Sequence, residues 1–103
     1  MPYNPKYYLA ALEPGRSPRV RRMAAELRRR LPRTPCWEDR CVSHRTLVQE
    51  LPDLTGLSRL SVQKLLAAYR ALGWLALVGQ KVGYRHDTRA YAILRGSPLD
   101  QPS

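Results

Sequence analysis

Residues 54–75, LTGLSRLSVQKLLAAYRALGWL, indicate the fold of this chain most directly. Ser58 stands directly before a helical pattern, where its hydroxyl can accept a hydrogen bond from an amide of the first turn. Apolar residues then recur at steps of three and four, which places them on one face of a helix. They are Val62, Leu65, Leu66, Tyr69 and Leu72. Gly73 follows at the position of a left-handed C-terminal cap. We therefore expect an amphipathic helix whose apolar face points into a core.

The opposite side of the first two turns is polar and basic. It carries Arg59, Leu60, Ser61, Gln63 and Lys64. An arginine can bridge two acceptors of guanine, a glutamine can match adenine, and a serine or lysine can hold a phosphate. A polar helix face can also simply face solvent, without binding a partner. The segments around the helix decide between these interpretations.

A second helix is expected just before this one. Ser43 can cap a short helix that runs to Leu51, after which Pro52, Asp53 and Gly56 supply turn chemistry. Two helices would then flank one connection.

A hairpin is expected after the long helix. Residues 74–78 and 90–94 are apolar runs typical of strands, and residues 79–88 between them are basic and contain two glycines. The hairpin would have a positively charged tip.

These residues resemble a known family, the winged helix-turn-helix DNA-binding domains of prokaryotic regulators. The sequence GLSRLSV at 56–62, followed by Leu65-Leu66 and by LGWL at 72–75, is similar to the turn, recognition helix and first wing strand of the gluconate-repressor type. The similarity covers residues 43–94. It implies an α+β, mainly α, winged helix-turn-helix fold, with a three-helix core plus a β-hairpin wing and a short extra N-terminal helix. The segment from Leu51 to Gly56 is longer than the usual turn of this family.

The resemblance also implies roles for single residues, because family members place the second helix in the major groove and the wing on the neighbouring backbone or minor groove. The expected groove contacts are Ser58, Arg59, Ser61, Gln63 and Lys64, and the expected wing contacts are Lys81, Arg85, His86 and Arg89. Arg59, Ser61 and Gln63 are expected to set sequence preference. Lys64, Arg45 and the wing cations are expected to set salt-dependent affinity.

Composition favours a polyanionic partner. The chain has 103 residues with 18 Lys and Arg against 8 Asp and Glu, a formal charge of +10 and a pI near 10.5. This length suits one domain with short extensions. No apolar run approaches a membrane span and no signal-peptide pattern opens the chain, so we expect a cytoplasmic, nucleoid-associated protein without membrane contact.

An arginine-rich helix is expected upstream. Ser17 and Pro18 make a helix start, and the apolar spacing continues to Leu31 before Pro32. The outer face carries Arg19, Arg21, Arg22, Arg28, Arg29 and Arg30, with Glu26 as the only acid. Such a face is either solvated or in contact with phosphates, and the mutual repulsion of the charges favours phosphate contact.

The two ends of the chain lie outside the expected winged domain, residues 17–95. In the extension 1–16, Asn4 and Pro5 can begin a short helix with Tyr7, Tyr8, Leu9 and Leu12. This helix would pack either on the first helix of its own domain or on a second copy in a dimer. The tail 96–103 has no apolar periodicity and is expected to be disordered.

Cys36, Cys41 and His44 form a Cys-x4-Cys-x2-His array, and His86 is a conceivable fourth metal ligand. Because structural zinc sites more often show Cys-x2-Cys pairs, we rank reduced cysteines first, a local disulfide second and zinc third. No metal or cofactor is expected.

Catalysis finds no support in the sequence. The acidic residues are scattered, and no glycine-rich phosphate loop or nucleophile arrangement occurs. We therefore expect a small, sequence-preferring protein that binds double-stranded DNA, a homodimeric transcription regulator of a prokaryote, plasmid or phage, with no small-molecule substrate. The alternatives are a replication, partition or packaging factor that binds repeated DNA sites, and a winged-helix adaptor that binds protein.

Overall fold

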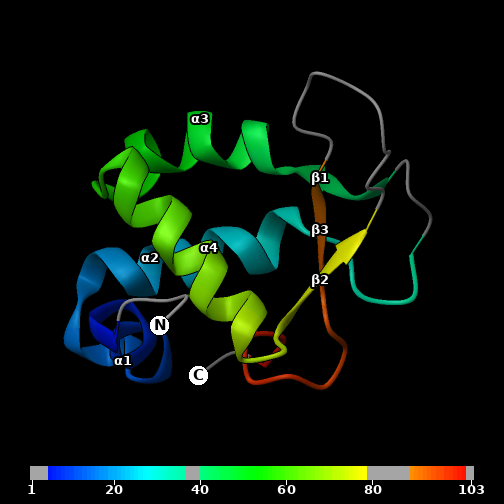
Figure 1. The fold of residues 1–103 in the computed structure, drawn as a ribbon, viewed down its shortest axis with the longest axis horizontal. Coiled ribbons are helices and arrows are strands. Elements are labelled where there is room, and N and C mark those ends of the chain that lie inside the picture. Colours follow the sequence, from blue (N-terminus) through cyan, green and yellow to red (C-terminus); the bar gives the residue numbers. More distant parts are fainter. Residues whose placement is uncertain (1–4, 37–39, 79–88, 102–103) are drawn as a thin grey trace.

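The computed structural model describes residues 5–36, 40–78 and 89–101. Within these residues the fold is α+β and mainly helical, with helices on one side and a small antiparallel sheet on the other (Figure 1). The helices are α1 (Pro5–Leu12), the 3-10 turn η1 (Pro14–Arg16), α2 (Pro18–Arg30), α3 (His44–Thr55) and α4 (Arg59–Ala71). The strands are β1 (Val42–Ser43), β2 (Leu75–Val78) and β3 (Ala90–Ile93).

Three helices begin at serines that act as N-caps. The hydroxyl oxygen of Ser17 accepts a hydrogen bond from the Val20 amide at 3.3 Å, and Ser43 and Ser58 do the same for the amides three residues ahead, each at 3.1 Å. Each cap satisfies an amide that has no partner within its own helix. These three helix starts confirm the sequence-based prediction.

The expected end of α3 at Leu51 is wrong. The helix continues through Pro52 to Thr55, and Gly56 caps it in the left-handed conformation at φ 79°. A proline in the last turn removes one backbone hydrogen bond. The Thr55 hydroxyl donates to the Leu51 carbonyl at 2.7 Å, and the Gly56 amide donates to the Pro52 carbonyl at 2.9 Å. The connection between α3 and α4 is therefore only residues 56–58, and it is not the long turn expected from the sequence.

The sheet holds a short strand that sequence analysis missed. β3 is the middle strand, with β1 antiparallel on one side and β2 antiparallel on the other. Val42 lies opposite Tyr91 and Leu75 lies opposite Ile93. A two-residue strand has no periodicity of its own to detect. Through β1 the sheet is joined directly to the start of α3.

The core confirms the apolar face expected for α4. Val62, Leu65, Leu66 and Tyr69 are buried, and they meet buried side chains from α2, α3 and β3. Leu72 is only partly buried, at the end of the helix. One continuous cluster of buried residues thus joins the helices to the sheet.

The C-terminal segment differs from the expected disordered tail. Residues 96–101 form turns, and Leu99 is only 3% exposed and belongs to the core cluster. The Arg33 guanidinium donates to Asp100 at 2.6 Å, and the Gly96 amide donates to the other carboxylate oxygen of Asp100 at 3.1 Å. A single apolar residue has no sequence pattern, so its burial follows from the space that the other elements leave for it.

The Asp100 contacts make stability depend on pH. Hydrogen bonds from Gly96 and Arg33 hold the pKa of Asp100 below its ordinary value. A carboxylate with a lowered folded-state pKa stabilises the fold above its unfolded-state pKa of about 3.9, and this contribution is lost as the pH falls through the folded-state pKa. We expect Asp100→Asn to lower the Tm slightly at pH 7, with the difference from wild type disappearing in strong acid. The exposed Asp53, as Asp53→Asn, is the control; an equal Tm change in both variants would contradict the assignment.

Helix α1 packs on α4 rather than on the first helix of the core. The Tyr7 hydroxyl lies 3.2 Å from the Ser61 hydroxyl oxygen, and Ala11 is buried in the core cluster. Tyr7 and Tyr8 are partly buried against the same cluster. The extension is thus built into the domain through the helix that carries the candidate site.

Candidate nucleic-acid interface

Helix α4 presents a continuous outward face. The side chains on it share one helical stripe and are all exposed, as helical phase requires. They are Arg59, Leu60, Gln63, Lys64, Ala67, Arg70 and Ala71. Four of them, Arg59, Leu60, Gln63 and Lys64, were expected on this face. Arg70 was missed because only the first two turns were considered, although its spacing of seven from Gln63 could have revealed it.

The two serines proposed for the same surface have intramolecular partners. The Ser58 hydroxyl caps α4 and donates to the Ser61 hydroxyl at 3.0 Å. Ser61 is half-buried beside Tyr7. Both hydroxyls therefore help to fix the start of α4 and its contact with α1, a structural role that the sequence did not indicate for Ser61.

A cleft of about 340 Å³ lies beside the exposed face of α4. Its walls come from α4, from the start of α3 and from β3 with the residue before it. The lining residues are His44, Gln63, Ala67, Arg70, Ala71, Arg89 and Tyr91. The fold thus brings together Gln63 and Arg89, two residues assigned to DNA from separate parts of the sequence.

A buried polar pair supports one wall of this cleft. His44 Nδ1 lies 2.9 Å from the Tyr91 hydroxyl, and the two ring centroids are 5.8 Å apart. His44 belongs to α3 and Tyr91 to β3, so the hydrogen bond holds the helix start against the middle strand. Arg45, the next residue on the first turn of α3, is exposed.

The basic side chains of α4 differ from those of α2 in their partners. Within the described residues, Arg59, Lys64 and Arg70 form no ion pair. On α2, by contrast, Glu26 pairs with Arg29 at 2.8 Å and with Arg30 at 3.2 Å. Unpaired cations on one face attract a polyanion more strongly than cations already neutralised by carboxylates.

Two arginines of α2, Arg29 and Arg30, thus form ion pairs within the fold. Arg30 also reaches Glu50 of α3 at 3.2 Å. Hydrogen bonding from Arg29, and then from Arg30, lowers the pKa of Glu26 below its ordinary value. The repulsion expected along α2 is offset at the C-terminal end of this helix. In the first turn of α2, the Arg19 side chain lies against Gly56, in the turn before α4.

Three proposed contacts, Lys81, Arg85 and His86, lie outside the described residues. Their assignment to DNA therefore rests on the sequence alone.

The cysteine and histidine array is not assembled into a metal site by the residues described. The Cys36 and Cys41 sulfur atoms lie 2.9 Å apart without a disulfide bond. His44 uses Nδ1 for Tyr91. Among the described residues, no three His, Cys, Asp or Glu side chains gather as metal ligands would.

Comparison of the chain with protein-family models, with curated proteins and with solved structures gives no match. In the part of the chain that the structure describes, no helix has the length and apolar character needed to cross a bilayer.

Proposed function

We propose that this protein binds double-stranded DNA and acts by binding rather than by catalysis. The observation that carries the proposal is the outward face of α4, where Arg59, Lys64 and Arg70 have no ion-pair partner among the described residues and flank the exposed Gln63. The major groove of DNA admits an α-helix, and its phosphates attract cations. The net charge of +10 adds a long-range attraction to the same partner.

The arrangement of elements supports a winged helix-turn-helix as the binding module. Helices α2, α3 and α4 supply the three-helix core, and α3 and α4 are joined by the short turn 56–58. The paired strands β2 and β3 supply the base of the wing. With α4 in the major groove, Arg89, directly before β3, lies on the same side as Gln63. The family resemblance assigns Lys81, Arg85 and His86, which lie outside the described residues, to the neighbouring backbone or minor groove.

The side chains divide into two groups in this proposal. Arg59 and Gln63 have the forked donors and acceptors that read base edges, so they set sequence preference. Lys64, Arg70 and Arg89, together with Arg45, set salt-dependent affinity through phosphates. Ser58 and Ser61 act mainly by holding the first turn of α4 in place.

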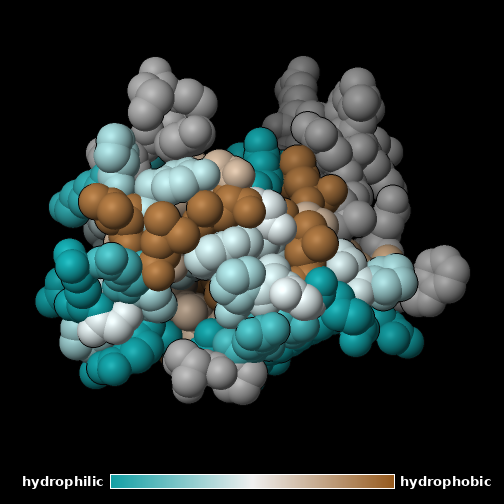
Figure 2. Space-filling model, turned by 90° about the horizontal axis from the view of Figure 1, so that it is seen from below, coloured by the Kyte–Doolittle hydropathy of each residue, from teal (hydrophilic) through white to brown (hydrophobic). Residues whose placement is uncertain are grey.

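A homodimer is part of the proposal, because two recognition helices can then occupy half-sites one helical turn apart. Helix α1 lies at the lower left of Figure 1, and its Leu9 and Leu12 are exposed. Seen from below, the surface shows hydrophobic patches bordered by hydrophilic side chains (Figure 2). We assign a second copy of the chain to the exposed Leu9 of α1, and regulation of transcription in a prokaryote, plasmid or phage to the dimer.

A selection from random duplex DNA tests the proposal. The selected duplex is then compared with a scrambled duplex by fluorescence anisotropy at several salt concentrations. We expect a preference of about a thousandfold and a palindromic sequence, as a dimer requires. Equal binding to all duplexes, with a steep dependence of affinity on salt, would contradict a regulatory role and favour a role in packaging or partition. No binding at moderate salt would overturn the proposal and favour a protein adaptor, for which Leu60, 59% exposed on the same face, is the candidate contact.

A further inference from the structure

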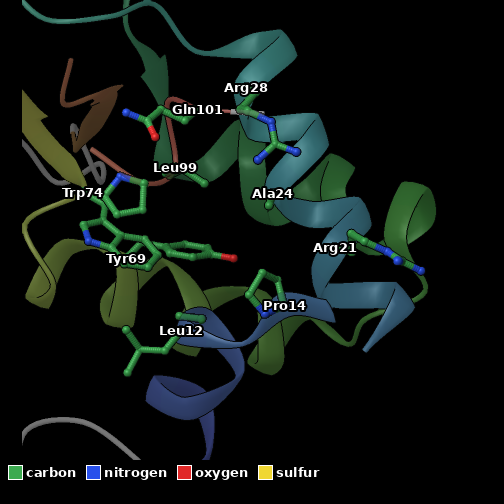
Figure 3. A pocket seen from close by; sticks show the side chains of 11 residues that line it. Leu12, Pro14, Arg21, Ala24, Arg28, Tyr69, Trp74, Leu99 and Gln101 are labelled. Atoms are coloured by element: carbon green, nitrogen blue, oxygen red, sulfur yellow. The ribbon is translucent and has the colours of Figure 1, made fainter. Parts of the chain in front are cut away.

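A second hollow lies on the buried side of α4, away from the proposed DNA surface. It is a cavity of about 190 Å³, open on one side, between α1, α2, α4 and the C-terminal turns. Its walls are mainly apolar, and Leu12, Ala24, Trp74 and Leu99 come from four different parts of the chain (Figure 3). For scale, an engineered apolar cavity of about 150 Å³ holds benzene. The cavity is therefore large enough for one small ring.

The side chain of Tyr69 lines this cavity and carries a buried hydroxyl. The side chain is 1% exposed, and its hydroxyl has no hydrogen-bond partner in the described part of the chain. In Figure 3 the oxygen points toward the lining residues Pro14 and Ala24, while the ring stacks on Trp74 with centroids 5.9 Å apart. Buried hydroxyls are nearly always hydrogen-bonded, because an unsatisfied one destabilises the fold. This hydroxyl therefore lacks the partner that a buried donor normally has.

The electrostatics of the cavity favour an anion that accepts hydrogen bonds. Burial raises the pKa of the Tyr69 phenol, so it stays protonated, and the positive charge of Arg28 partly opposes this rise. Figure 3 shows Arg28 reaching toward the cavity from α2, whereas Arg21 points away from it. Within the described residues, Arg28 has no ion pair, unlike its neighbour Arg29. One neutral donor and one cation therefore face the same apolar space.

We propose that this cavity binds a small organic carboxylate with a single ring or a branched apolar body. The apolar part would lie between Leu12, Trp74 and Leu99. The carboxylate would accept hydrogen bonds from the Tyr69 hydroxyl and the Arg28 guanidinium, because a charged guanidinium and a carboxylate form strong, directional hydrogen bonds. The site does not depend on DNA binding, since its residues lie behind the outward face of α4.

Titration of the full-length protein with benzoate, followed by NMR and calorimetry, tests this site, with neutral benzamide as the matched probe. We expect saturable benzoate binding about tenfold tighter than benzamide, since a hydrogen bond to a charged group contributes more than a neutral one. The amide shifts should map to α1, α2, α4 and residues 96–101. No saturable binding, or benzamide binding as tightly as benzoate, would overturn the proposal.

Two variants assign the contacts. Tyr69→Phe should weaken benzoate binding several-fold, because it removes one hydrogen-bond donor. It should also raise the Tm of the ligand-free protein, because it removes a buried hydroxyl that has no partner. Arg28→Gln should bring the affinities for benzoate and benzamide together. Arg29→Gln is the matched control. It removes the same charge from the next residue, whose guanidinium is already paired with Glu26. Unchanged benzoate affinity in both Tyr69→Phe and Arg28→Gln would refute the assigned site.

Discussion

Replacing Arg59 by alanine should weaken binding to the selected duplex by about 1 to 3 kcal/mol and relax preference at one base pair. Arg59 is the first residue of α4, exposed and without an ion pair among the described residues, so its fork is available for a base edge. Lys64→Ala should instead weaken all duplexes alike and lower the salt slope by about one. Anisotropy titrations of the selected and scrambled duplexes at several salt concentrations separate these two effects.

Arg29→Ala is the control for this experiment. It removes one positive charge from an exposed arginine that already pairs with Glu26 at 2.8 Å, so net charge falls equally while the face of α4 stays intact. We expect little change in affinity beyond the loss of general attraction. If Arg29→Ala were as damaging as Arg59→Ala, binding would depend on net charge and α4 would not be the reading element. Loss of sequence preference in Lys64→Ala, with preference intact in Arg59→Ala, would reverse the assigned roles.

Replacing Leu99 by alanine should lower the free energy of unfolding by about 2 to 5 kcal/mol. Leu99 is 3% exposed and fills space between the helices, so truncation leaves a void that the surrounding side chains refill only in part. This is a large fraction of the roughly 5 to 15 kcal/mol that stabilises a domain. Urea denaturation monitored through tryptophan fluorescence and circular dichroism gives the value.

Leu94→Ala provides the matched control, because Leu94 is 40% exposed and follows β3 directly. Its expected effect is within about 0.5 kcal/mol. Equal losses in the two variants would mean that the C-terminal turns do not belong to the folded core. The contrast therefore tests the ordered segment 96–101, where sequence analysis expected disorder.

The two proposed sites use opposite sides of one helix. Gln63 and Arg70 of α4 face the cleft beside β3, whereas Tyr69 faces the cavity under α1 and the C-terminal turns. Because Tyr7 of α1 also touches Ser61 in the first turn of α4, both sides share the same packed elements. DNA titrations and benzoate titrations nevertheless address different side chains, so either proposal can fail without the other.

Features that depend on neighbouring residues could be predicted from the sequence. A serine cap and the amide it satisfies lie three residues apart, and the apolar face of α4 repeats within each turn, so Ser17, Ser43, Ser58 and residues 62–69 were correctly interpreted. The left-handed glycine at Gly73 is equally local.

Features that depend on residues distant in sequence became visible only in the folded structure. The burial of Leu99, the contact between Tyr7 and Ser61, and the pairing of Arg30 with Glu50 each join segments remote in sequence. The continuation of α3 through Pro52 also required the folded context, because propensity alone favours a turn there. A helix start depends on the side chain and the amides of neighbouring residues. Which side chains remain exposed to a partner depends on how the helices and strands pack together.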